Sequence, residues 1–190
     1  RGRRYVSCNS PRKRRPLTQG HHDALTDLAN RSLFMDRLRN ILSSNSNQAG
    51  LLIIDMDGLK AINDSLGHRA GDAAIKELAS RISMSTKESD LVARLGGDEF
   101  AVILTPLQGS DGISETIRRI ELSFEREFTF EGQTIPIHAS MGGASFPDDS
   151  MDLEKLIETA DSRMYAAKRS HRQNAASTPL NQPSKRNNPD

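Results

Sequence analysis

A short aliphatic run that ends in acidic residues constrains the fold of this chain more than any other feature of its sequence. Residues 51–54 read Leu-Leu-Ile-Ile, and Asp55 and Asp57 follow directly after them. A strand without a polar face is usually buried on both sides, so helices are expected to cover both faces of its sheet. The run is far shorter than the roughly 20 apolar residues that cross a bilayer. It therefore predicts the central strand of a layered domain and no membrane span.

Helical and extended patterns alternate along the rest of the chain. Helical spacing of apolar residues predicts helices over residues 33–42, 59–66, from Gly71-Asp72 to about Met84, 112–127, and from Ser150 or Asp152 onward. Extended stretches are expected near residues 128–130 and 135–144. This alternation predicts an α+β fold, an α/β sandwich with a mixed sheet covered by helices.

Two further apolar runs predict a β-hairpin. Residues 91–95 and 100–104 flank the sequence Gly96-Gly97-Asp98-Glu99. Paired glycines supply the positive φ that a tight turn demands. We therefore expect two strands joined by a turn that carries two acidic residues.

Acidic residues stand at the ends of these apolar strands rather than on solvated faces. If the strands are neighbours, Asp55 and Asp57 meet Asp98 and Glu99. Such a cluster repels itself, because close like charges raise one another's pKa values. Mg²⁺ would neutralise it, since this ion prefers carboxylate oxygens and is shared with substrate phosphates, and two such ions can assist phosphoryl transfer. The structural alternative is that one acid caps a turn and another faces water.

Length, cysteine count and charge limit the number of domains, the compartment and the partners that can be expected. The 190 residues suffice for one domain with tails, and the single cysteine, Cys8, forms no internal disulfide, which favours a reducing, cytoplasmic compartment. Residues 1–16 hold seven Lys or Arg and no acid, whereas residues 17–173 are net acidic. We expect residues 1–20 to form a basic flexible arm or linker and residues 175–190 a disordered polar tail. Without interleaved aromatics or a recognisable nucleic-acid-binding fold, no nucleic acid partner is expected.

Several motifs, in order along the chain, resemble those of one protein family. Arg94-Leu95-Gly96-Gly97-Asp98-Glu99-Phe100 resembles the signature of the GGDEF family, the diguanylate cyclases. The companion stretches that resemble the family's other motifs are Asp23 to Arg31, Asp55 to Asp64, Gly67-His68 with Gly71-Asp72, Ser140-Met141-Gly142, and Ala160-Asp161 with residues 164–168. The resemblance covers about residues 21–174.

This resemblance implies a fold and a reaction. The fold is a five-stranded, mainly antiparallel central sheet flanked by helices, as in nucleotidyl cyclases and polymerase palm domains. The implied enzyme is a diguanylate cyclase, which condenses two GTP into cyclic di-GMP and pyrophosphate by attack of a 3′-hydroxyl on an α-phosphate. Mg²⁺ is the implied cofactor, with Mn²⁺ as an alternative ion. The resemblance further implies an active homodimer, an upstream sensor or regulatory domain, and a cytoplasmic location, either free or as part of a larger membrane-anchored protein.

The resemblance also implies roles for individual residues. The metal ligands would be Asp55, the backbone carbonyl of Met56, and Asp98. Asp98 or Glu99 would help to deprotonate the attacking hydroxyl. The residues that would steady phosphates are Lys60, Lys168 and Arg172. Gly96 and Gly97 would leave room for the nucleotide, and Asn63 and Asp72 would read guanine.

Each of these residues also has a plain structural interpretation when it is taken alone. Asn63 would be a polar helix residue and Asp72 a helix N-cap. Lys168 and Arg172 would form a solvated helix face, four residues apart. The ordered set of motifs favours the functional interpretation.

Two departures from the family's pattern carry expectations of their own. The family's inhibitory product site usually has Arg-x-x-Asp before the signature, and here Lys87 and Asp90 hold those positions. Lysine lacks the planar fork of arginine, so we expect weak or absent product inhibition. His171 replaces a frequent glycine between Lys168 and Arg172.

Two other functions stay open at this point. The chain could be a catalytically silent GGDEF domain that serves as a nucleotide-binding regulatory module, although such domains commonly lose the signature acids that are intact here. It could also bind nucleic acid through the basic arm, in which case deletion of residues 1–16 would abolish binding.

Overall fold

The structure is a computed structural model, and it describes residues 20–44, 48–107, 109 and 111–177. Five strands form one sheet in the order β1-β3-β4-β2-β7, and β5 and β6 form a separate pair. The strands are β1 (Ala29–Asn30), β2 (Ala49–Met56), β3 (Leu91–Gly96), β4 (Glu99–Leu104), β5 (Thr129–Phe130), β6 (Gln133–Thr134) and β7 (Ala139–Phe146). The helices are α1 (Arg31–Ser43), α2 (Leu59–Leu66), α3 (His68–Ser85), α4 (Gly112–Ser123) and α5 (Leu153–Ser177).

The central sheet is mixed. Strand β1 pairs with β3 in parallel, whereas the pairs β3–β4, β4–β2 and β2–β7 are antiparallel. The expectation of a mainly antiparallel sheet is therefore corrected to a mixed one, while the five strands and the flanking helices are confirmed. No hairpin fixes the direction of β1, because α1, β2, α2 and α3 separate it from β3 in the chain.

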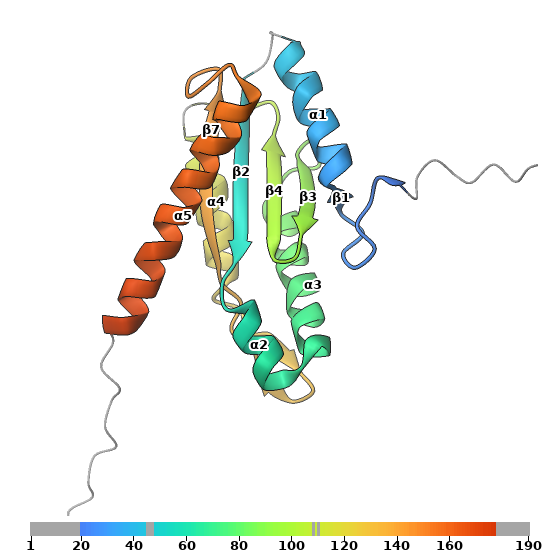
Figure 1. Ribbon diagram of the computed structural model, residues 1–190, viewed down its shortest axis with the longest axis vertical. Coiled ribbons are helices and arrows are strands. Elements are labelled where there is room, and N and C mark those ends of the chain that lie inside the picture. The colour runs from blue at the N-terminus through green and yellow to red at the C-terminus, as the bar shows by residue number, and fades with distance from the viewer. Residues whose placement is uncertain (1–19, 45–47, 108, 110, 178–190) are drawn as a thin grey trace, which may run out of the picture.

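Strand β2 lies inside the sheet and is buried on both faces, as its sequence predicts. Its side chains alternate between two cores, with Leu51 and Ile53 in one and Leu52 and Ile54 in the other. The first core is completed by buried residues of α1 and α5, and the second by residues of α3 and α4. The domain is thus a three-layer sandwich with a helix pair against each face of the sheet (Figure 1).

The hairpin prediction is confirmed, with a shorter turn than expected. Strand β3 runs to Gly96 and β4 starts at Glu99, so only Gly97 and Asp98 form the turn. Gly96 and Gly97 have φ values of 142° and 55°, a region that glycine enters without strain. Glu99 therefore belongs to the strand and not to the turn.

The start of α3 differs from the prediction that Gly71-Asp72 caps the helix. The helix begins at His68, after Gly67 at φ 83°, so Asp72 lies inside it and is not an N-cap. Gly71 is needed for packing, because a Cβ there would lie 2.0 Å from Asn63 Oδ1.

Other helix boundaries in the structure differ from the predicted ones by a few residues. Helix α4 ends at Ser123 rather than at residue 127. Helix α5 begins next to Asp152, whose Oδ1 accepts a hydrogen bond from the Lys155 N–H at 3.0 Å. It continues to Ser177, three residues into the segment expected to be a disordered tail. The remaining tail and nearly all of the predicted basic arm lie outside the described residues.

No helix in the described part of the chain has both the length and the apolar character needed to cross a membrane.

Candidate active site

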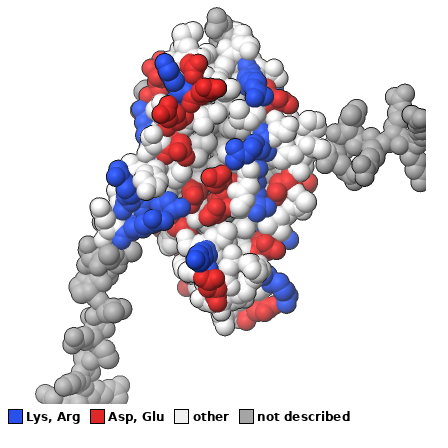
Figure 2. Space-filling model, viewed as in Figure 1, with Lys and Arg blue, Asp and Glu red and all other residues white. Residues whose placement is uncertain are grey.

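Strand pairing brings the predicted acidic residues together. Asp55 of β2 is the direct partner of Glu99 in β4. The Met56 N–H donates to the Asp98 carbonyl oxygen at 3.0 Å, so the hairpin turn lies beside the end of β2. The expectation that the two strand ends are neighbours is confirmed. Figure 2 shows acidic side chains gathered where β2 ends, and basic side chains over the lower half of α5.

Asp55 lies at the centre of this charge arrangement. Its carboxylate is largely buried and accepts a hydrogen bond from Lys168 Nζ of α5. Burial raises the pKa of Asp55, and the nearby Asp98 and Asp57 carboxylates raise it further, while Lys168 opposes them. The net pKa shift of Asp55 is upward, with burial as its main cause, so contact with Lys168 does not fully offset the cost of a buried charge beside two other carboxylates. Lys168, implied by the resemblance to steady phosphates, is here the partner of an implied metal ligand.

The donor atoms at this strand end suit a hard divalent cation. Asp55 and Asp98 offer carboxylate oxygens, and the backbone of Met56, at the end of β2, lies next to Asp98 through its N–H contact with the Asp98 carbonyl oxygen. Within the described residues, no three His, Cys, Asp or Glu side chains group as a ready-made metal cage. A few carboxylates with a backbone carbonyl fit an ion that keeps several waters and is shared with substrate phosphates, as Mg²⁺ does.

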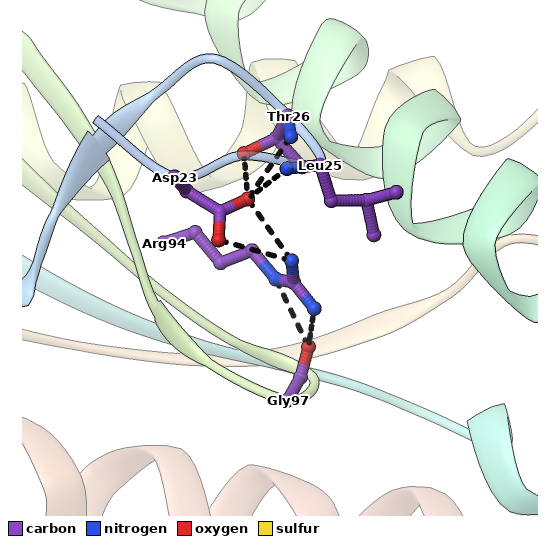
Figure 3. Close-up of polar contacts among 5 residues, drawn as sticks. All are labelled: Asp23, Leu25, Thr26, Arg94 and Gly97. Atoms are coloured by element: carbon purple, nitrogen blue, oxygen red, sulfur yellow. Dashed lines mark hydrogen bonds and ion pairs between the residues drawn. The ribbon is translucent and has the colours of Figure 1, made fainter. Parts of the chain in front are cut away.

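A partly buried arginine, Arg94, links the hairpin turn to residues 23–26 (Figure 3). Arg94 Nη2 and Nε donate to the Gly97 carbonyl at 2.8 and 3.1 Å. Arg94 Nη1 donates to both carboxylate oxygens of Asp23, at 3.0 and 3.2 Å. Asp23 Oδ1 also accepts from the backbone N–H of Leu25 and from the backbone and hydroxyl of Thr26.

The electrostatics of Asp23 show that this clamp holds a charged carboxylate. Burial alone raises the pKa of Asp23, but hydrogen bonds from Thr26 and Arg94 outweigh it and hold the pKa below its ordinary value. Sequence reasoning quoted both motifs without assigning a role to Asp23 or Arg94. The available signal was a lone arginine within an apolar strand.

Glu99 contacts α1 through Arg31, the first residue of that helix. Arg31 Nη2 lies 3.3 Å from Glu99 Oε2, and Arg31 Nε donates to the Leu95 carbonyl at 3.2 Å. The side chains of both Arg31 and Glu99 are about half exposed or more. This carboxylate is therefore accessible, but it already has a cationic partner.

The residues implied to read guanine lie on two helices that pack closely. Asn63 of α2 lies against Gly71 of α3, and Asp72 is the next residue, with an exposed side chain. Lys60 is exposed in the first turn of α2. Gly58, at φ 76°, precedes α2 without a side-chain cap, so the first N–H groups of this helix lack an intrahelical partner.

A cavity of about 810 Å³ extends between α5, α4 and the end of β2. Lys168, His171 and Arg172 line it from α5, Gly58 from the start of α2, and Phe124 from the C-terminal end of α4, directly after Ser123. Lys168 and Arg172 thus share one cavity with the start of α2, as phosphate-binding residues would. The volume falls within the range usual for small-molecule sites, about 300–1,000 Å³.

Lys87 and Asp90, which the resemblance places at the inhibitory product site, line a second cavity, of about 450 Å³. The Asp90 carboxylate accepts hydrogen bonds from the N–H groups of Lys87 and Thr105, at 2.9 and 3.2 Å. Arg119 of α4 lines the same cavity, and its Nε is buried without a hydrogen-bond partner within the described part of the chain. Sequence reasoning missed Arg119, because only the fold brings α4 next to the turn before β3.

The sandwich fold and the acidic residues at two adjacent strand ends define an α+β domain with a candidate nucleotide and metal site. The family model described as "Diguanylate cyclase, GGDEF domain" matches residues 20–174. The chain therefore belongs to the GGDEF family, as its motifs predicted.

Named relatives agree with this assignment. Diguanylate cyclase TpbB of Pseudomonas aeruginosa (strain UCBPP-PA14) is 41% identical over 169 residues, which are 87% of this chain and 39% of that protein. Probable diguanylate cyclase DgcE of Escherichia coli (strain K12) is 39% identical over 150 residues, 77% of this chain and 14% of that protein. The chain thus spans well under half of these relatives.

Solved structures show the same fold. A TpbB structure from P. aeruginosa PAO1 comprising only the GGDEF domain has a TM-score of 0.75 at 41% identity, covering 79% of this chain and 90% of that one. The coiled coil and GGDEF domain of DgcB from Caulobacter crescentus, in complex with c-di-GMP, has a TM-score of 0.73 at 30% identity, covering 80% and 83%.

Proposed function

We propose that this domain is a diguanylate cyclase that condenses two GTP into cyclic di-GMP with release of pyrophosphate. The observation that carries the proposal is the intact Gly96 to Phe100 hairpin, hydrogen-bonded through Asp98 to the end of β2. Membership of the GGDEF family and the names of the relatives support it. The matching segment is a minor part of these relatives, and we propose that an upstream regulatory domain is the source of the input signal for this chain.

Asp55, Asp98 and the Met56 carbonyl would hold the divalent cation, which we propose to be Mg²⁺, with Mn²⁺ as an alternative. When bound, the ion supplies Lewis-acid stabilisation of the phosphate charge and lowers the pKa of the attacking hydroxyl. Asp98 or Glu99 would accept the proton from that 3′-hydroxyl through a carboxylate oxygen. Arg31 contacts Oε2 of Glu99 at 3.3 Å, so Glu99 would take this role through its other carboxylate oxygen, Oε1.

The triphosphate would bind between α5 and the start of α2. Lys168 and Arg172 line the cavity there, and the N–H groups of the first turn of α2 favour an anion. Lys60, in the same turn, would add a positive charge at the leaving group. We propose that Lys168 gives up its contact with Asp55 and binds phosphate instead when the metal and nucleotide bind.

The guanine base would be read by Asn63 and Asp72 beside the α2–α3 contact. A carboxylate can accept hydrogen bonds from the N1–H and the N2 amine of guanine together, whereas adenine offers no such donor pair on that edge. Gly96 and Gly97 have no Cβ to block the approach of the nucleotide to the hairpin backbone. GTP is therefore the proposed substrate and ATP is not.

The active form would be a homodimer in the cytoplasm. Each subunit presents one nucleotide, and formation of two phosphodiester bonds requires the two sites to face each other. GTP and the cyclic product are the proposed small-molecule partners, and nucleic acid is not a proposed partner.

Comparison of two nucleotides tests the proposal. The purified chain is incubated with GTP or ATP and Mg²⁺ at high protein concentration, and the products are separated by chromatography. We expect cyclic di-GMP from GTP and no cyclic product from ATP. Equal processing of both nucleotides, or linear products only, would contradict the assignment.

The Arg94 clamp gives a prediction about the hairpin. Arg94→Lys keeps the charge, but one ammonium group cannot hold both Asp23 and the Gly97 carbonyl as the guanidinium fork does. We expect the rate of cyclic di-GMP formation to fall about tenfold, because small displacements of reacting groups are costly. Initial rates and a thermal melt measure the effect, with Arg39→Lys, an exposed pair with Asp36, as the control. An unchanged rate would show that the clamp does not position the turn.

The Lys87 position gives a prediction about product inhibition. Because lysine replaces the family's usual arginine, added cyclic di-GMP should inhibit the chain weakly or not at all. Lys87→Arg should lower the inhibition constant about tenfold, measured by titrating cyclic di-GMP into the initial-rate assay. Strong inhibition of the unmodified chain would contradict this and would favour Arg119 as the replacement for the missing guanidinium group.

A further inference from the structure

His171 is held by two polar residues at the end of the central strands. Ser140, fully buried on β7, lies with its Oγ 3.0 Å from both carboxylate oxygens of Asp57. His171 Nδ1 of α5 lies 3.2 Å from Ser140 Oγ and 3.3 Å from Asp57 Oδ2. The three residues come from β7, from the segment after β2 and from α5, so only the folded chain assembles them.

The contacts with Ser140 and Asp57 indicate which ring nitrogen of His171 donates to these residues. A serine hydroxyl has a single proton, and its position equidistant from both oxygens of Asp57 directs that proton to the carboxylate. Nδ1 of His171 then acts as a donor toward the oxygens of Asp57 and Ser140. The other ring nitrogen, Nε2, lies on the opposite side of the ring, away from these oxygens.

His171 also belongs to the basic face of α5. It is three residues after Lys168 and one before Arg172, and side chains three and four positions apart lie on the same helix face. All three residues line the 810 Å³ cavity that also contains Gly58. Glu121 and Glu125 line its α4 side, so the basic groups that could meet an anion are concentrated on α5.

We propose that His171 is a third phosphate-contacting residue, which donates from Nε2 to the β- or γ-phosphate of the nucleotide. This inference rests on the proposed function and extends its phosphate site beyond Lys168 and Arg172. Asp57 and Ser140 position the ring, and a hydrogen-bond donor at Nε2 offsets the repulsion between the nearby Asp57 carboxylate and a triphosphate at this edge of the cavity.

Two substitutions test the roles of the two ring nitrogens of His171 separately. His171→Asn places an amide nitrogen near the Nδ1 position and keeps the contact with Asp57, but it removes the group that faces phosphate. His171→Gln places an amide nitrogen near the Nε2 position. Arg169→Gln is the control, because it removes a full positive charge from the same helix turn, where Arg169 lies over the exposed Tyr165 ring.

The readout is nucleotide affinity, measured by calorimetry with Mg²⁺ and 3′-deoxyGTP, which lacks the attacking hydroxyl. GMP, which lacks the β- and γ-phosphates, is the comparison ligand. We expect His171→Asn to weaken 3′-deoxyGTP binding about tenfold and GMP binding less than twofold, as loss of one charge-assisted hydrogen bond predicts. His171→Gln should recover most of the affinity, and Arg169→Gln should change it less than twofold.

The binding measurements distinguish failure of this inference from failure of the proposed function. If the unmodified chain binds 3′-deoxyGTP and His171→Asn binds it equally well, the inference is wrong while the proposed function stands. Equal losses for 3′-deoxyGTP and GMP would also overturn it, since they would indicate a general structural effect. If the unmodified chain binds neither guanine nucleotide, the proposed function fails and the inference fails with it.

Discussion

Asp98→Ala is expected to lower cyclic di-GMP formation by at least about 1,000-fold, to the limit of detection. Asp98 is a proposed metal ligand and a candidate proton acceptor, and removal of one such group costs about 100- to 10,000-fold in comparable enzymes. The fold should survive, because Asp98 lies in a two-residue turn and its strand contact is made by the backbone carbonyl. Product formation from GTP and Mg²⁺ is measured alongside a thermal melt.

Glu88→Ala is the matched control for this substitution. Glu88 is an exposed carboxylate in the turn that precedes β3, at the opposite end of the hairpin. Both variants lose one negative charge, but only Asp98 faces the end of β2. Undiminished turnover in Asp98→Ala, or equal losses in the two variants, would remove Asp98 from the site.

Gly142→Ala is expected to destabilise the domain by about 3 kcal/mol or more, or to prevent folding. Gly142 lies in β7, where a Cβ would come within 2.1 Å of the Met164 nitrogen and 2.2 Å of the Ala160 oxygen. Both are backbone atoms of α5, so relief of the clash requires movement of the whole helix, and overpacking of this kind is costly. For a domain of this size the melting temperature should fall by roughly 10 °C.

Gly20→Ala serves as the control for the glycine substitution. A Cβ at Gly20 would meet no atom within 4 Å, so the melting temperature should stay nearly constant. Soluble Gly142→Ala protein with an unchanged melting temperature would contradict the close packing of β7 against α5. A shift in Gly142→Ala alone would support it.

The parts of the fold that depend on local patterns could be predicted from the sequence. The buried strand β2 was visible as an unbroken aliphatic run, and the hairpin was visible as paired glycines between apolar segments. Strand β1 was not predictable, since it has only two residues and its partner β3 lies more than 60 residues away. The start of α3 was misplaced because Gly71 resembles a cap in sequence, whereas its actual role is the close contact with Asn63.

Only part of the candidate site could likewise be predicted from the sequence. The acidic strand ends were found because a charge directly after an apolar run is visible in the sequence. The pairing of Lys168 with Asp55 and the arrival of Arg119 beside Lys87 depend on packing between distant helices and strands. The role proposed for His171 likewise needed the fold, because Asp57 and Ser140 are 114 and 31 residues away from it.

The most direct test of the central claim is the stoichiometry of turnover by the chain fused to a dimerising coiled coil. Cyclic di-GMP and pyrophosphate are both quantified after incubation with GTP and Mg²⁺. We predict two pyrophosphates for each cyclic di-GMP, since each of the two bonds formed releases one. Binding of GTP without formation of either product would contradict a cyclase and would favour the silent nucleotide-binding module.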